Sequence, residues 1–118
     1  MPQRDPNLSR CALLIIDLQY ATGSSEGALS RKMKAEGSDV VDYRFDRIER
    51  LVVPNALRLS TAFRLAGRPV VYVTIDAATP DALDAPVHMR KLFTELKNYI
   101  GSNEHEVLDE LKPSLVTT

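Results

Sequence analysis

In residues 11–20, CALLIIDLQY, a run of small and branched apolar residues ends abruptly at Asp17. The run is short and does not alternate with polar residues, which is typical of a strand that is apolar on both faces. Such strands occur in parallel sheets that helices cover on both sides. We therefore expect a buried strand over residues 11–18, with a carboxylate at its carboxyl end.

The sequence also predicts a helix and a second strand that is apolar on both faces. In VVPNALRLSTAFRLAG (residues 52–67), Pro54 suits a first helical turn and Gly67 suits a helix end. Apolar residues at spacings of three and four predict one apolar face, with Arg58 and Arg64 turned outward. These residues are Val52, Leu59, Ala62, Phe63 and Ala66. The β-branched stretch RPVVYVTI (68–75) then predicts a strand parallel to the first.

The remaining segments predict shorter elements. Glycines break residues 21–38 into a long loop, with one helical turn near residues 28–33. Residues 87–99 predict a helix, and residues 104–111 predict a short amphipathic one. The inward residues of the first of these helices are Met89, Leu92, Phe93 and Leu96. Residues 114–118, SLVTT, begin like a third strand.

Two or three parallel strands alone would leave open edges and an uncovered face. We therefore predict an α/β fold, namely a three-layer, Rossmann-like, mostly parallel sheet flanked by helices. We expect the sheet to be incomplete in this chain and completed by another polypeptide. On this interpretation, residues 1–118 form the amino-terminal part of a single domain.

Composition narrows the class of protein. The 15 basic and 16 acidic residues nearly cancel, which argues against nucleic acid or an anionic membrane as a partner. The longest apolar run is far below the roughly 20 residues that span a bilayer, and residues 1–10 lack the apolar core of a signal peptide. One cysteine excludes an internal disulfide, and the two histidines show no zinc spacing. We expect a cytoplasmic protein without metal or cofactor.

Asp17 is the first candidate for chemistry. Ligands of open α/β sheets bind outside the carboxyl ends of the strands, where Asp17 is expected to lie. The alternative is that its oxygens accept hydrogen bonds from the backbone of the next turn. Position alone leaves both interpretations open.

Three stretches together resemble the isochorismatase-like cysteine hydrolases: ALLIIDLQ (12–19), VPNALRLSTAFRLAGRPVVYVTI (53–75) and EHEVLDELKP (104–113). Their order, spacing and local character resemble that family over residues 11–118, except in the loop at 21–42. The family includes isochorismatases, nicotinamidases, N-carbamoylsarcosine amidohydrolases and ureidoacrylate-type amidohydrolases. The resemblance rests on the ordered set of three stretches rather than on any one of them.

The resemblance implies a catalytic triad of aspartate, lysine and cysteine. Asp17 matches the aspartate, a general acid/base, and Gln19 matches the glutamine that commonly follows it. The family's lysine and cysteine come later than residue 118, so the resemblance implies that a second polypeptide supplies both. The implied reaction is cleavage of a C–N bond in a small amide, ureido or imide substrate by a cysteine thiolate.

Residues of this chain do not replace the missing pair. Cys11 lies six residues before Asp17, about 20 Å along a strand at about 3.3 Å per residue, and is better interpreted as a small buried hydrophobe. Lys112 precedes the expected third strand and is better interpreted as a solvated lysine at a helix end. His88 and His105 stand alone and are interpreted as surface or capping residues.

Two further residues are candidates for binding substrate. Tyr20 and the glycine-rich loop after it lie at the mouth of the expected pocket. Asp76 follows the second strand, where it either binds substrate beside Asp17 or caps a turn. The sequence therefore predicts catalytic Asp17 with substrate contacts from Gln19, Tyr20 and Asp76.

The leading hypothesis is a hydrolase that acts on a small molecule, requires a companion polypeptide and forms a homo-oligomer. A different hypothesis is a non-catalytic α/β binding or assembly module that lacks the nucleophile. A third, a nucleotide-binding domain, predicts phosphate contacts at a helix start, and no glycine-rich phosphate motif follows either strand.

Overall fold

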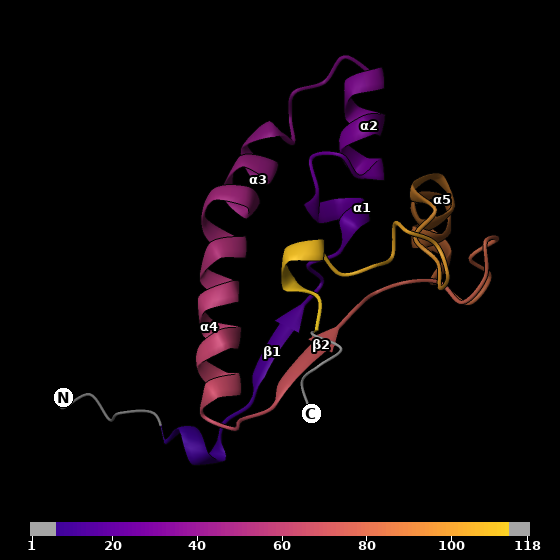
Figure 1. The fold of residues 1–118 in the computed structure, drawn as a ribbon. Coiled ribbons are helices and arrows are strands. Elements are labelled where there is room, and N and C mark those ends of the chain that lie inside the picture. The colour runs from indigo at the N-terminus through magenta and orange to yellow at the C-terminus, as the bar shows by residue number, and fades with distance from the viewer. Residues whose placement is uncertain (1–6, 114–118) are drawn as a thin grey trace, which may run out of the picture.

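The computed structural model describes residues 7–113, and the third strand predicted for residues 114–118 lies outside them. It has mixed α/β character, with two parallel strands beside a long helical column (Figure 1). Strand β1 spans Leu13–Ile16 and strand β2 spans Val70–Val73, joined in register from their first residues to their last. Both predicted strands and their parallel pairing are confirmed.

The helical column joins three segments into one continuous structure (Figure 1). Helix α3 spans Asp42–Arg47, a π-helical turn spans Ile48–Val52, and helix α4 spans Val53–Leu65. Pro54 has no N–H to continue an α-helical ladder, and the N–H of Val53 bonds to the carbonyl of Ile48, five residues back. Proline thus lies at the junction of the π-helical turn and α4.

The carboxyl end of α4 follows the sequence prediction. Gly67 has φ +69°, a left-handed conformation that glycine adopts without steric cost. The N–H groups of Gly67 and Arg68 bond to the carbonyls of Arg64 and Phe63, at 3.0 and 2.8 Å. These bonds satisfy carbonyls that the helix end would otherwise leave unpaired.

The predicted apolar face of α4 is wrong. Val52, in the π-helical turn before α4, and Leu59 are 40% and 50% exposed, and Phe63 is half-buried, whereas Ser60 is the residue buried in this helix. Arg64 is also not turned outward: its Nη2 donates to the Tyr72 hydroxyl of β2 at 2.6 Å. The helix therefore buries a small polar residue and turns an arginine toward the sheet, which apolar periodicity alone does not anticipate.

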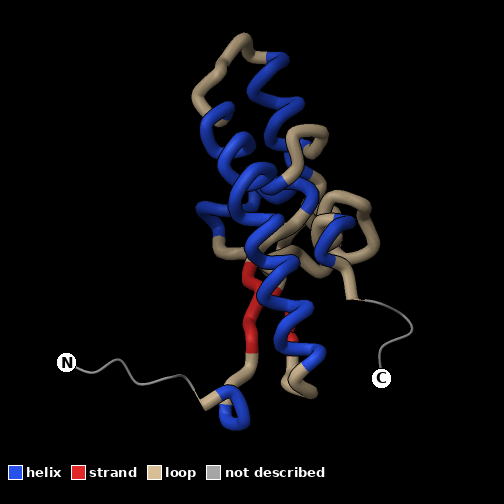
Figure 2. The backbone as a smooth tube through the Cα atoms, turned by 60° about the vertical axis from the view of Figure 1, so that its left-hand side comes forward, coloured by secondary structure: helices blue, strands red, loops and turns tan. Residues whose placement is uncertain are grey.

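The two faces of the sheet differ. Successive side chains of a strand point to opposite faces, so Leu13, Ile15, Val70 and Tyr72 share the face that α4 covers (Figure 2). Ile15 on that face is buried. The opposite face, here called the open face, consists of Leu14, Ile16, Val71 and Val73, which are 53%, 55%, 44% and 38% exposed. In residues 7–113, the strands are apolar on both sides but covered on one.

Residues 21–38 are more helical than predicted. Helix α1 spans Tyr20–Gly23 and α2 spans Ala28–Ala35, two turns rather than one. A Cβ at Gly27 would lie 2.0 Å from the carbonyl oxygen of Tyr20, so the close approach of the two helices requires glycine there. The buried Glu104 carboxylate accepts the N–H of Ala28 at 3.0 Å and so caps α2 from a distant part of the chain.

Helix α5 spans Val87–Leu96 and ends at Lys97, which has φ +54°, so it stops short of the predicted residue 99. It contributes Phe93 to a core cluster, with Met89 packed against it. The other buried members of this cluster are Ala77, Ala82 and Ala85. The prediction that Leu92 points inward is wrong, because its side chain is 42% exposed.

The helix predicted for residues 104–111 is also wrong. In this segment a 3-10 turn forms over Asp109–Leu111 instead. Another 3-10 turn, over Leu8–Arg10, precedes β1. The Glu106 carbonyl accepts the N–H of Tyr20 at 2.8 Å, and the N–H of Leu108 donates to Leu18 at 2.9 Å. Because residues 18–21 form hydrogen bonds with these backbone groups, residues 104–108 cannot use them for a helical ladder of their own. No helix in the described part of the chain is long and apolar enough to cross a membrane.

Candidate functional site

Asp17 lies directly after β1, at the carboxyl edge of the sheet. Its N–H donates to Val73 at 2.8 Å, so the backbone extends the ladder by one residue. Its φ is +60°, a left-handed conformation that is uncommon for residues other than glycine. The carboxylate is exposed and forms no hydrogen bond or ion pair with residues 7–113. The capping alternative therefore finds no support in the described backbone, and the group is free to meet a ligand.

Gln19 joins the ends of the two strands. It is 1% exposed, and its Oε1 accepts the N–H of Ile75 at 2.9 Å while its Nε2 donates to the Ile75 carbonyl at 3.1 Å. Nε2 also donates to the carbonyl of His105 at 2.9 Å. Both amide hydrogens are thus engaged within the chain. A substrate contact by Gln19 stays a prediction, and its observed role is to hold the edge together.

Asp76 pairs with a histidine from a distant part of the sequence. Its Oδ2 lies 3.2 Å from Nδ1 of His105 and accepts the Thr74 hydroxyl at 3.2 Å. The side chains of Asp76 and His105 are 16% and 21% exposed, so they reach the surface at the edge of the sheet. The turn that follows Asp76 begins at Ala78. The N–H of Ala78 donates to the Asp84 carboxylate, at 3.0 and 3.1 Å, so Asp84 caps this turn.

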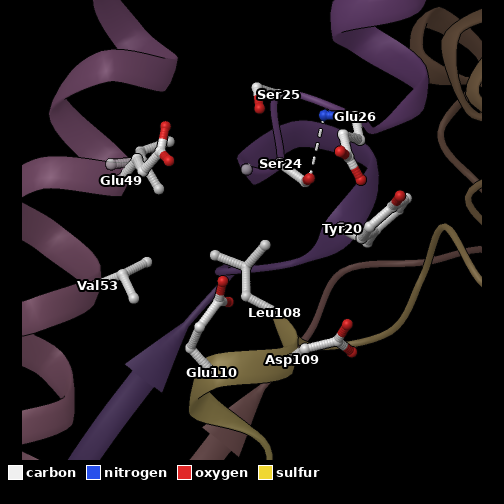
Figure 3. Close-up of a pocket in the computed structure, with 11 residues that line it drawn as sticks. Tyr20, Ser24, Ser25, Glu26, Glu49, Val53, Leu108, Asp109 and Glu110 are labelled. Atoms are coloured by element: carbon white, nitrogen blue, oxygen red, sulfur yellow. Dashed lines mark hydrogen bonds between the residues drawn. The ribbon is translucent and has the colours of Figure 1, made fainter.

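A cavity of about 360 Å³ lies beyond the carboxyl end of β1, between the helical column and the turn at Asp109–Leu111 (Figure 3). Tyr20 lines it, as expected for a residue at the mouth of a pocket. Small, apolar and acidic residues form the remaining wall: Gly23, Ser24, Ser25, Ile48, Val53, Leu108, Glu26, Glu49, Asp109 and Glu110. Asp17 and Asp76 do not line this cavity. Of the four predicted site residues, all within residues 7–113, Tyr20 alone lines this cavity.

The thiol and the amine expected of the triad do not come from Cys11 or Lys112. Cys11 precedes β1, at the opposite end of the strand from Asp17, and its Sγ contacts the Asn7 carbonyl at 3.2 Å. Lys112 pairs with Asp109 at 2.9 Å, and this hydrogen bond raises the pKa of the lysine above its usual value. No cluster of three or more metal-binding side chains occurs among the described residues.

Sequence reasoning missed His105 and Asn98 as parts of this edge. Asn98 is 3% exposed, and its Nδ2 donates to the Ile75 carbonyl at 2.9 Å, beside Gln19. Its Oδ1 is buried without a hydrogen-bond partner in the described structure. Neither residue has a local motif around it. Only the return of segment 98–107 to the strand ends brings them to Asp76.

Comparison with protein-family models, with curated proteins and with solved structures finds no match to this chain.

Proposed function

We propose that this chain is the amino-terminal part of an isochorismatase-like cysteine hydrolase in which Asp17 acts as the general acid/base. The single observation that carries the proposal is the state of Asp17: an exposed carboxylate without partners among residues 7–113, at the carboxyl end of a parallel strand. Ligands of open α/β sheets bind at that position. Uncommon backbone conformations such as the left-handed one at Asp17 are also concentrated at functional sites.

The proposed reaction needs a thiol and an amine from a second polypeptide. Asp17 takes the proton of the cysteine thiol, and the thiolate attacks the carbonyl carbon of a small amide, ureido or imide substrate. The C–N bond breaks as Asp17 returns the proton to the leaving nitrogen. Water then attacks the thioester and gives one proton to Asp17. The carboxylic acid product leaves, and Asp17 returns that proton to the departing cysteine sulfur, which restores the thiol. The lysine's positive charge favours the thiolate.

The open face supports the need for that second polypeptide. Leu14 and Ile16 are more than half exposed, in a strand whose other face already has a helix against it. Parallel sheets occur almost only with both faces covered. A companion that adds strands and helices would bury this face while it brings lysine and cysteine to Asp17. We also propose that the assembly is cytoplasmic and forms a homo-oligomer.

The test begins with purification of the tagged protein from its own cells and mass measurement of every polypeptide that accompanies it. The assembly is then screened with small amides, ureides and imides, with mass detection of a thiol adduct. Asp17→Asn should lower turnover by about 10²–10⁴-fold, because the proton acceptor is lost while the shape is kept. Asp39→Asn, an exposed acid in the loop before α3, is the matched control. Equal turnover by the Asp17→Asn variant and the parent assembly would refute the proposal.

The alternative is a non-catalytic α/β module that acts through binding or assembly. The position of Cys11, the one cysteine, at the far end of β1 favours it. Purification as a lone, stable monomer, with no companion and no turnover, would support this function. A companion with a cysteine that a substrate-derived adduct modifies would exclude it.

A further inference from the structure

The pair formed by Asp76 and His105 has the geometry of an oriented imidazole. The carboxylate oxygen at 3.2 Å from Nδ1 is an acceptor, so it favours the tautomer with the proton on Nδ1. Nε2 then carries a lone pair. Among the described residues it forms no hydrogen bond, and Glu106 Oε1 lies 3.7 Å from it. Asp76 holds one side of the ring, and the other side faces the Glu106 carboxylate without a hydrogen bond to the described residues.

Other side chains already hold the loop that carries His105. The buried amides of Gln19 and Asn98 cross-link this part of the chain through the carbonyls of His105 and Ile75. The N–H of His105 also donates to the Ser102 hydroxyl at 3.2 Å. The backbone position of His105 thus has several supports besides the ring. The ring itself is 21% exposed, so a solute can reach it.

We propose that His105 is a ligand-binding residue of the sheet edge, with Asp76 as its positioning residue. Nε2 accepts a hydrogen bond from an N–H group of the ligand, and the Glu106 carboxylate beside it can accept a second. An NH2 group of a primary amide or ureido compound provides two such donors. This ligand class rests on the proposed hydrolase function, whereas the orientation of the ring does not.

The first experiment uses the whole chain and detects the imidazole nitrogens by long-range proton–nitrogen NMR. We expect the Nδ1-protonated tautomer in the neutral form of His105. Methylurea should shift the His105 ring signals in a saturable manner. Tetramethylurea has a similar core but no N–H, and it should leave them unchanged. His88, exposed on the first turn of α5, is the internal control, and its signals should respond to neither compound.

A variant separates orientation from folding. Asp76→Ala should remove the tautomer preference of His105 and weaken methylurea binding about tenfold, the loss expected for one oriented hydrogen bond. Asp76→Asn keeps an oxygen acceptor and should restore most of the binding. If methylurea does not shift the His105 ring signals, or if methylurea and tetramethylurea shift them equally, the inference is overturned. This outcome does not depend on whether the two Asp76 variants fold.

The complete assembly provides a second readout. His105→Gln should raise KM about tenfold with a smaller effect on kcat, whereas His88→Gln should leave both unchanged. An active assembly in which the two variants behave alike would overturn the role of His105 and leave the hydrolase proposal intact. Selective methylurea binding without any turnover would refute the hydrolase and support the binding residue.

Discussion

The side-chain amide of Gln19 hydrogen-bonds to both the N–H and the carbonyl of Ile75, at 2.9 and 3.1 Å. It meets these two groups as a backbone peptide would, just beyond the ends of β1 and β2. A buried side chain therefore continues the ladder where the strands themselves separate. The same amide reaches His105, so one residue ties three segments together at the candidate site.

Replacement of Gln19 by Leu should lower the free energy of unfolding by about 2 kcal/mol or more. The N–H of Ile75 and the carbonyl of His105 would lose their side-chain partner, and an unpaired buried group costs about 1–3 kcal/mol. Urea denaturation measures the change. Asn55→Ala, at an exposed position of α4, is the control and should stay within about 0.5 kcal/mol. Equal midpoints for both variants would contradict the role of Gln19.

Replacement of Glu104 by Ala should loosen the start of α2. The carboxylate accepts the N–H of Ala28 and pairs with Arg31, and loss of a helix cap costs about 0.5–2 kcal/mol. Hydrogen exchange should become faster at residues 28–31, whereas exchange in α4 should be unchanged. Glu36→Ala, which removes an exposed partner of Lys32 at the other end of α2, is the matched control. Unaltered exchange at Ala28 would argue against the cap.

The open face should drive association of the isolated chain. Replacing both Ile16 and Val73 by Thr keeps β-branched residues but adds hydroxyls to this face, so self-association should weaken about tenfold. Sedimentation velocity over a range of concentrations measures it. Leu65→Gln changes an apolar residue of α4 that is 85% exposed and should have a smaller effect. If Leu65→Gln weakens association more than the double variant does, the contact surface lies on α4.

Asp81 should contribute to acid sensitivity. The Thr79 hydroxyl and the N–H of Leu83 donate to its carboxylate, and they hold the pKa of Asp81 below its usual value of 3.8. A folded-state pKa below the unfolded one stabilises the fold above about pH 3.8. This contribution is lost as the pH falls from there through the folded-state pKa.

Asp81→Asn should therefore reduce the loss of stability between neutral pH and the acid range. Urea denaturation of the parent and the variant across this range provides the comparison, and carbon NMR of the carboxyl group follows its titration directly. Asp39→Asn is the control for removal of an exposed acid. A carboxyl that titrates at or above 3.8 in the folded chain would contradict the prediction.

The local sequence pattern predicts the strands correctly, but it predicts the contacts of the helices poorly. The β-branched runs predict β1 and β2 because few other conformations suit such residues. In α4, periodicity favours Leu59, yet Leu59 is half exposed, Ser60 is buried and Arg64 bonds to Tyr72. Both outcomes depend on how closely the helix approaches the sheet, and the helix sequence by itself does not encode that distance.

Local sequence patterns are enough to predict the two parallel strands, the glycine end of α4 and the place of Asp17 after β1. Three contacts come from the packing of the whole chain: Gln19 with Ile75, Asp76 with His105, and Glu104 with the first residue of α2. The physical reason is separation along the chain. Strand, turn and cap signals act over a few residues, whereas these three contacts join groups 56, 29 and 76 residues apart, which only the packed fold brings together.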